Sequence, residues 1–182
     1  MVSVTYAQTS SSEVHIVVQP PQRVRARRRL VPPLVARTDS PQLLEAFLNG
    51  TKHIYATLAL TASNGFDDAT YNLTGTFSVS GQGVNSYPRG SKKKGGGSSS
   101  SSQTPHQWIY FVFPGLGIRE PGLYTFTVFI NALDYSTKSL TVLCDKASRT
   151  FNVVYEAEPP GKPSPEEQAI LEDLRNNNLY DP

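Results

Sequence analysis

Arginines gather near the front of the chain in a pattern that suits anion binding. Five of them fall within seven residues: Arg23, Arg25, Arg27, Arg28 and Arg29. Their guanidinium groups repel one another unless an anion neutralises them, and each planar guanidinium matches two phosphate oxygens at once. Because alternate side chains of an extended segment share one side, four of the arginines would form a ridge with Arg28 opposite. Such a ridge could follow the phosphate backbone of a nucleic acid.

Composition by itself leaves other interpretations of this segment open. Basic clusters also act as nuclear-import signals or lie in solvated loops. The charge distribution favours an anionic partner: residues 1–39 hold six arginines against two acids, whereas residues 156–182 hold seven acids against two basic residues. Four further cations could add auxiliary phosphate contacts, although three of them lie in a Gly/Ser-rich loop where lysines often only aid solvation. They are Arg37, Lys92, Lys93 and Lys94.

Other residues that could carry chemistry do not form a recognisable pattern. The three histidines, at positions 15, 53 and 106, are far apart and lack a nucleophile or carboxylate partner nearby in the sequence. The single cysteine, Cys144, permits no internal disulfide and no cluster of closely spaced metal ligands. We therefore expect no enzymatic activity, cofactor, metal or small-molecule substrate. We also expect no membrane partner, because we find neither a secretory leader nor an apolar run of membrane-spanning length.

The elements that must position the arginines are predicted to be strands. Trp108–Phe113 is an unbroken apolar run, which indicates a strand buried on most sides. After a turn rich in proline and glycine, Leu123–Ile130 predicts a second strand, so that the two form a central hairpin. Its core-facing set is Tyr124, Phe126, Val128 and Ile130. Further strands are predicted over residues 13–19, 31–35 (at a sheet edge, because of its prolines), 53–62, 70–80, 138–143 and 149–155.

Two helices and the domain limits complete the expected organisation. Ser40-Pro41 predicts the start of a short helix, and Ser164-Pro165-Glu166-Glu167 is a capping box that predicts a C-terminal helix. We expect the apolar face of the second helix, with Ile170, Leu171 and Leu174, to dock on the sandwich. The expected organisation is a flexible terminus over 1–12 and one β-sandwich domain over 13–180. A low-complexity loop is expected at about 81–107.

Residues 109–124 (IYFVFPGLGIREPGLY) resemble the aromatic strand and glycine turn of the velvet domain of fungal developmental regulators. Val17–Pro21, Val31–Val35 and Leu73–Thr76 resemble further segments of that domain in the same order, and the similarity covers about residues 14–160. The resemblance implies an immunoglobulin-like, Rel-homology-like β-sandwich. With the two helices predicted above, the expected fold is such a sandwich with a short helix after the second strand and a C-terminal helix.

The resemblance also implies a function. It implies that the chain binds double-stranded DNA sequence-specifically through the five arginines. The chain would do so as a homodimer or as a heterodimer with another velvet-domain protein. The chain would then be a transcriptional regulator of fungal development, sporulation and secondary metabolism that moves between cytoplasm and nucleus. Neutralising about five phosphates predicts a log–log salt slope of about −4.5.

Departures from the velvet pattern motivate an alternative. Gln19 directly follows Val18 where the family has an arginine, and an acidic segment replaces the closing motif of the family. A chain with these changes could be a dimerisation subunit that pairs with another velvet protein without reading DNA. A third interpretation is a secreted ligand-binding sandwich, in which the glycosylation sequons at Asn49 and Asn72 would be modified.

Overall fold

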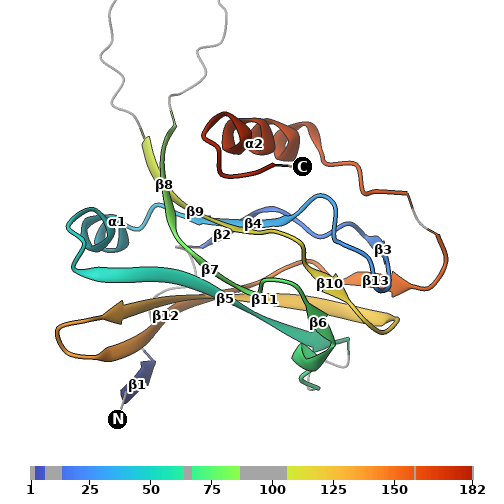
Figure 1. Ribbon diagram of the computed structural model, residues 1–182, viewed down its shortest axis with the longest axis horizontal. Helices are drawn as coiled ribbons and strands as arrows, with labels where there is room; N and C mark the ends of the chain where they lie inside the picture. Colours follow the sequence, from blue (N-terminus) through green and yellow to red (C-terminus); the bar gives the residue numbers. More distant parts are fainter. Residues whose placement is uncertain (1–2, 7–13, 64–66, 87–105, 158, 182) are drawn as a thin grey trace, which may run out of the picture.

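The main parts of the computed structural model are two facing β-sheets and two α-helices, and the structure describes residues 3–6, 14–63, 67–86, 106–157 and 159–181 (Figure 1). Strand accounts for 49% of the residues and helix for 16%, which confirms a mostly-β sandwich with one short and one C-terminal helix. Within these ranges, no helix is both long enough and apolar enough to span a bilayer.

The larger sheet is built on two long antiparallel strands, β5 (Lys52–Ala62) and β11 (Gly122–Asp134). The strands added to this pair are β7 (Ser78–Ser80) beside β5, β12 (Ser139–Ala147) and β13 (Phe151–Val154) beside β11, β1 (Ser3–Tyr6) beside β12, and β3 (Arg23–Arg25) beside β13. The strand that carries the first arginines therefore lies at an edge of this sheet.

The second sheet has four strands in the order β2 (His15–Val18), β4 (Leu34–Thr38), β9 (His106–Phe113) and β8 (Gln82–Ser86). The predicted edge strand over residues 31–35 is wrong. The strand begins only after the two prolines, so it keeps its N–H donors and lies between β2 and β9. A separate short pair joins β6 (Leu73–Thr74) to β10 (Gly117–Ile118).

The main core lies between the two sheets, because alternate residues of each strand point toward it. The predicted core-facing set of β11 is confirmed, since Tyr124, Phe126, Val128 and Ile130 are all buried. From the opposite sheet, β9 contributes Ile109, Phe111 and Phe113 to the same apolar cluster. The ring of Phe126 stacks on that of Phe151, with 4.9 Å between the centroids.

The central hairpin predicted from the two aromatic segments is wrong, because β9 and β11 belong to different sheets. The chain crosses from one layer to the other between them, and β10 forms within that crossing. Strands of facing sheets interdigitate their inward side chains, whereas paired strands place theirs side by side. The crossing therefore sets large aromatic residues of both strands into a single core.

Two further predictions from the sequence differ from the structure. The strand predicted over residues 70–80 is divided into the short helix η2 (Thr70–Asn72), β6 and β7. Gly75 turns the chain between β6 and β7 at φ 89°, and a Cβ there would overlap the Gly115 carbonyl. The stretch over 81–107 that was predicted to lack regular structure contains β8 and the start of β9.

Some predicted segments lie wholly or partly outside the described residues. Residues 87–105, which include Lys92, Lys93 and Lys94, belong to this group. Of the N-terminal residues 1–12 that were expected to be flexible, Ser3–Tyr6 forms β1, parallel to β12, and the others lie outside the description.

Both predicted helices form, and the second covers the outer face of the smaller sheet. The short helix α1 (Pro41–Leu48) follows β4, and α2 is Pro165–Asn176. The capping box of α2 is confirmed, with the Ser164 hydroxyl accepting from the Glu167 N–H at 3.2 Å. Leu171 and Leu174 pack on the outward-facing Val18, Val35, Val84 and Tyr110, with Ile170, Trp108 and Val112 at the margin of this cluster. The run Trp108–Phe113 is apolar at every position because both faces of β9 are covered.

Candidate nucleic-acid interface

The arginine segment is a short strand followed by a turn. Strand β3 ends at Arg25, and Arg27 adopts φ 61°, in the left-handed region. Ala26 and Leu30, which flank the last three arginines, are only 6% and 5% exposed and belong to the main core. The chain must turn between these two anchors, so the ridge expected of a fully extended segment does not form.

Backbone hydrogen bonds hold this turn against two other parts of the sandwich. The Ala26 N–H donates to the Val154 carbonyl at 2.7 Å, and the Arg27 N–H donates to the Ile118 carbonyl at 2.7 Å. The Leu30 N–H donates to the Leu116 carbonyl at 2.6 Å. The guanidinium groups are therefore carried by backbone that is fixed to β13 and to the β10 region. The sequence signal for this anchoring, two apolar residues four apart around three arginines, was missed.

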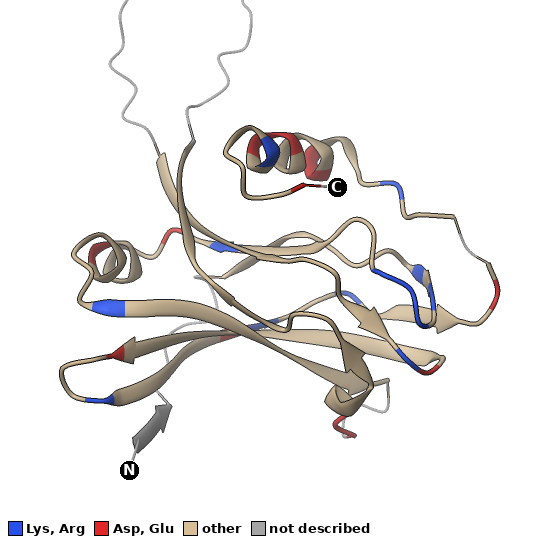
Figure 2. Cartoon of the chain, viewed as in Figure 1, with Lys and Arg blue, Asp and Glu red and all other residues tan. Residues whose placement is uncertain are grey.

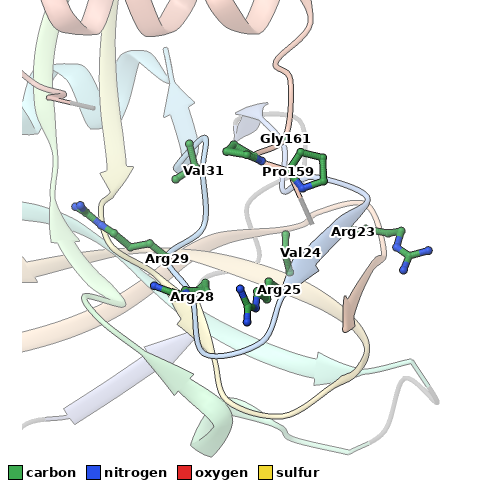
Figure 3. A pocket seen from close by; sticks show the side chains of 9 residues that line it. Arg23, Val24, Arg25, Arg28, Arg29, Val31, Pro159 and Gly161 are labelled. Atoms are coloured by element: carbon green, nitrogen blue, oxygen red, sulfur yellow. The ribbon is translucent and has the colours of Figure 1, made fainter. Parts of the chain in front are cut away.

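Four of the five arginines line one surface cavity of about 260 Å³. They are Arg23, Arg25, Arg28 and Arg29, and the other lining residues are Val24, Val31, Pro159, Pro160 and Gly161. Figure 3 shows Arg23 and Arg29 extending away from each other, with Arg25 and Arg28 between them. This fan of guanidinium groups suits an elongated anion with several charges better than one isolated phosphate.

The wall of the cavity comes from the segment between β13 and α2. The Gly161 N–H donates to the Val31 carbonyl at 3.1 Å, which ties this segment to the residue just after the arginine turn. A Cβ at Gly161 would overlap the Pro21 ring, so a glycine is needed for this close approach. The cavity thus depends on two segments that are distant in the sequence.

Arg27 differs from Arg25, Arg28 and Arg29 because it contacts a carboxylate of the described chain. Its Nη2 lies 3.2 Å from Glu120 Oε1, and its Nε donates to the Arg119 carbonyl at 3.4 Å. The other Glu120 oxygen accepts from the Tyr155 hydroxyl at 2.8 Å, and the Arg27 guanidinium carbon is 5.8 Å from the centre of the Tyr155 ring. Hydrogen bonds from these two donors, Tyr155 first and then Arg27, lower the pKa of Glu120. The hydrogen bond between Tyr155 and Glu120 also raises the pKa of Tyr155.

Three of the other arginines, Arg25, Arg28 and Arg29, are available to an external anion. Within the described part of the chain, the side chains of Arg25, Arg28 and Arg29 have no acidic partner. All three are exposed. Figure 2 shows several basic segments at the end of the sandwich where β3 and β13 lie, with other basic segments spread over the rest of the chain.

Arg37, expected as an auxiliary phosphate contact, lies apart from the arginine-lined cavity. It belongs to β4, and its guanidinium carbon is 3.8 Å from the centre of the Trp108 ring. Its Nη1 donates to the Tyr110 hydroxyl at 2.9 Å. Arg37 lines a different hollow, together with His15 and the first residues of α2. The structure therefore does not bring Arg37 together with the five clustered arginines.

The structure also places several other residues that the sequence offered for chemistry or modification. His106 lies 3.0 Å from Asp39, a pairing that the sequence did not reveal, and Cys144 is buried. Among the residues that the structure describes, no three His, Cys, Asp or Glu side chains gather so as to hold a metal ion. The side chain of Asn72 is buried at 7% exposure, so the folded chain does not present this sequon for glycosylation.

Neither the protein-family models nor the curated proteins compared with this sequence match it. Function must therefore be inferred from the arginine-lined cavity and its surroundings.

Proposed function

We propose that this chain binds double-stranded DNA, as a transcriptional regulator of the velvet type, and that the arginine-lined cavity contacts the phosphate backbone. One observation carries the proposal: four exposed arginines, two on β3 and two on the turn that follows it, line a single cavity, and backbone hydrogen bonds hold that turn. Arginine forks bind phosphate oxygens in pairs, and such contacts supply much of the affinity of proteins for DNA.

The arrangement of the side chains favours a duplex over a small anion. The guanidinium groups spread along the cavity, and Arg25, Arg28 and Arg29 have no acidic partner among the described residues. Phosphate contacts fix the position of a protein on DNA, while base contacts determine which sequence it binds. We propose that most of the five clustered arginines bind phosphates and that one or two of the five reach guanine edges in the major groove.

The biological part of the proposal rests on the resemblance to velvet domains. It comprises a Rel-homology-like sandwich, a homodimer or a heterodimer with another velvet-domain protein, and movement between cytoplasm and nucleus. It also includes control of fungal development, sporulation and secondary metabolism. The mostly-β sandwich is compatible with that resemblance.

The salt dependence of DNA binding tests the electrostatic mechanism. Three phosphates neutralised by Arg25, Arg28 and Arg29 predict a log–log slope of about −2.7, or about 40-fold weaker binding at 200 mM than at 50 mM salt. The measurement is a fluorescence-anisotropy titration of the full chain with a duplex library. Substituting all three residues with alanine should remove that slope and leave the melting temperature nearly unchanged, because the side chains are exposed.

A matched variant controls for net charge. Substituting Lys52, Lys146 and Arg175 with alanine removes the same number of positive charges from exposed positions outside the cavity. This control should keep the slope of the wild-type chain. A flat salt response of the wild-type chain, or equal losses in both triple variants, would contradict phosphate binding by the cavity.

The acidic helix α2 favours a second candidate function, a dimerisation subunit that does not read DNA. This helix carries Glu166, Glu167, Glu172 and Asp173 over the smaller sheet, and Figure 2 shows these acids on it. Negative charge there would repel a duplex that approached this face. Size-exclusion chromatography combined with a DNA-shift assay separates the two functions. An isolated chain that shifts DNA through Arg25, Arg28 and Arg29 would exclude the subunit that does not read DNA.

A further inference from the structure

Arg27 lies among the proposed DNA-binding arginines, yet it is absent from the lining of their cavity. It follows Ala26 in the anchored turn. Its φ of 61° shows that the backbone there has left the extended conformation of β3. Its guanidinium is partly exposed to solvent and also contacts the Glu120 carboxylate. Arg27 is thus engaged by the protein itself, whereas Arg25, Arg28 and Arg29 have no acidic partner among the described residues.

The contact with Glu120 is organised but accessible. Glu120 binds Arg27 through one carboxylate oxygen and Tyr155 through the other, and the Arg119 carbonyl accepts from Arg27 as well. The side chains of Arg27 and Glu120 are nevertheless 67% and 49% exposed. Exposed ion pairs are weak because water screens them, so an incoming phosphate can replace this carboxylate. The same guanidinium face cannot bind both anions bidentately at one time.

We propose that Glu120 competes with the phosphate backbone for Arg27, and thereby sets the affinity and salt dependence of the arginine-lined site. This inference rests on the proposed function, because it assumes that a polyanion occupies the cavity. In the free chain, Arg27 is held by Glu120. In the wild-type complex Glu120 still withholds Arg27 from the phosphates, and only an Arg27 released from Glu120 adds one contact to those of its neighbours.

The test compares Glu120→Gln with Glu156→Gln in the full chain, titrated with a duplex library from 50 to 200 mM salt. Glu156 is exposed, lies one residue beyond Tyr155 and forms no ion pair with a described residue. Both substitutions remove one negative charge from the same end of the molecule. Only the first releases Arg27, so a difference between them reports that release and not the change in net charge.

The expected result is a steeper salt slope for Glu120→Gln, by about 0.9, because one more phosphate is neutralised. Its affinity at 50 mM salt should exceed that of Glu156→Gln on the order of tenfold, and the advantage should shrink as salt rises. In an Arg27→Ala background, Glu120→Gln should give no advantage. Melting temperatures of all variants check that each is folded.

Three other results would count against the competition in different ways. Equal slopes and affinities for the two glutamine variants would overturn it, while loss of binding in the triple arginine variant would leave the proposed function intact. An advantage of Glu120→Gln that survives in Arg27→Ala would also overturn it, since Arg27 would not be the group released. No DNA binding by any folded variant would refute the proposed function and the competition together.

Discussion

Arg27 and Arg28 show how the surroundings of a side chain decide its role. The two are adjacent and identical in type, yet one contacts Glu120 and the other lines the cavity. The difference arises because Ala26 and Leu30 are both buried, which makes the chain turn at Arg27. A solvated loop, one of the interpretations left open by composition, would not require two buried anchors and three backbone hydrogen bonds to the sandwich.

The titration of Tyr155 tests the cluster at the residue scale. Its hydroxyl donates to Glu120, and this hydrogen bond raises the pKa of Tyr155 above its ordinary value of 10.0. In Glu120→Gln the negative acceptor is lost, so the pKa of Tyr155 should fall toward that value. Carbon-13 NMR of the tyrosine ring, with Tyr155→Phe to assign the signal, measures this change. An unchanged pKa in Glu120→Gln would show that the hydrogen bond does not form in solution.

The pH dependence of stability gives a second prediction for the same cluster. The pKa of Glu120 is lowered in the folded chain, chiefly by the Tyr155 hydroxyl and then by Arg27. A carboxyl with a lowered folded pKa stabilises the fold above its ordinary pKa of 4.5, and this contribution is lost as pH falls through the folded value. The melting temperature of the wild-type chain should therefore exceed that of Glu120→Gln at pH 7, and the difference should vanish in strong acid. A constant difference across this range would exclude Glu120 ionisation as its cause.

At the scale of elements, helix α2 is tied to the smaller sheet by its apolar side chains and its cap. Leu174 is fully buried against the outer face of that sheet, whereas its neighbour Arg175 is exposed. The Gln19 N–H also donates to Glu167 at 2.9 Å, which joins the first turn of α2 to the residue after β2. The predicted docking of this helix face is thereby confirmed.

Replacing Leu174 with alanine tests the docking of α2. The change removes a buried leucine and leaves a cavity, so we expect the free energy of unfolding to fall by about 2 to 5 kcal/mol. Arg175→Ala is the matched control on the same helix, and it should change stability by less than about 0.5 kcal/mol. Urea unfolding followed by circular dichroism measures both. Similar small effects in the two variants would indicate that α2 does not pack on the sheet in solution.

At the scale of the whole molecule, the facing sheets share a core that supports the arginine turn. Ala26 and Leu30 belong to the same apolar cluster as Phe111 of β9 and Phe126 of β11. The surface that carries the arginines is thus continuous with the centre of the sandwich. A substitution in this core should therefore lower the free energy of unfolding of the whole domain without changing the charges on its surface.

Phe126→Ala tests this dependence on the shared core. Phe126 is fully buried and stacks on Phe151, so its loss should lower the free energy of unfolding by about 3 to 5 kcal/mol. Thr127→Ala, on the same strand but facing outward, should have a much smaller effect. Thermal and urea unfolding measure the two variants. Equal losses would mean that the β11 residues do not alternate between core and surface as described.

The sequence by itself determined the local features that depend on near neighbours. Alternating apolar residues identified the inward face of β11, and Ser164 with Glu167 identified the start of α2, because both patterns express interactions within one element. The arginine cluster was equally visible. How these elements pair was not, since an apolar strand can pack beside another strand or across from it, as β9 and β11 do. The tertiary structure alone decided that Glu120 contacts Arg27 and that Pro159–Gly161 walls the cavity, because both contacts join segments distant in the chain.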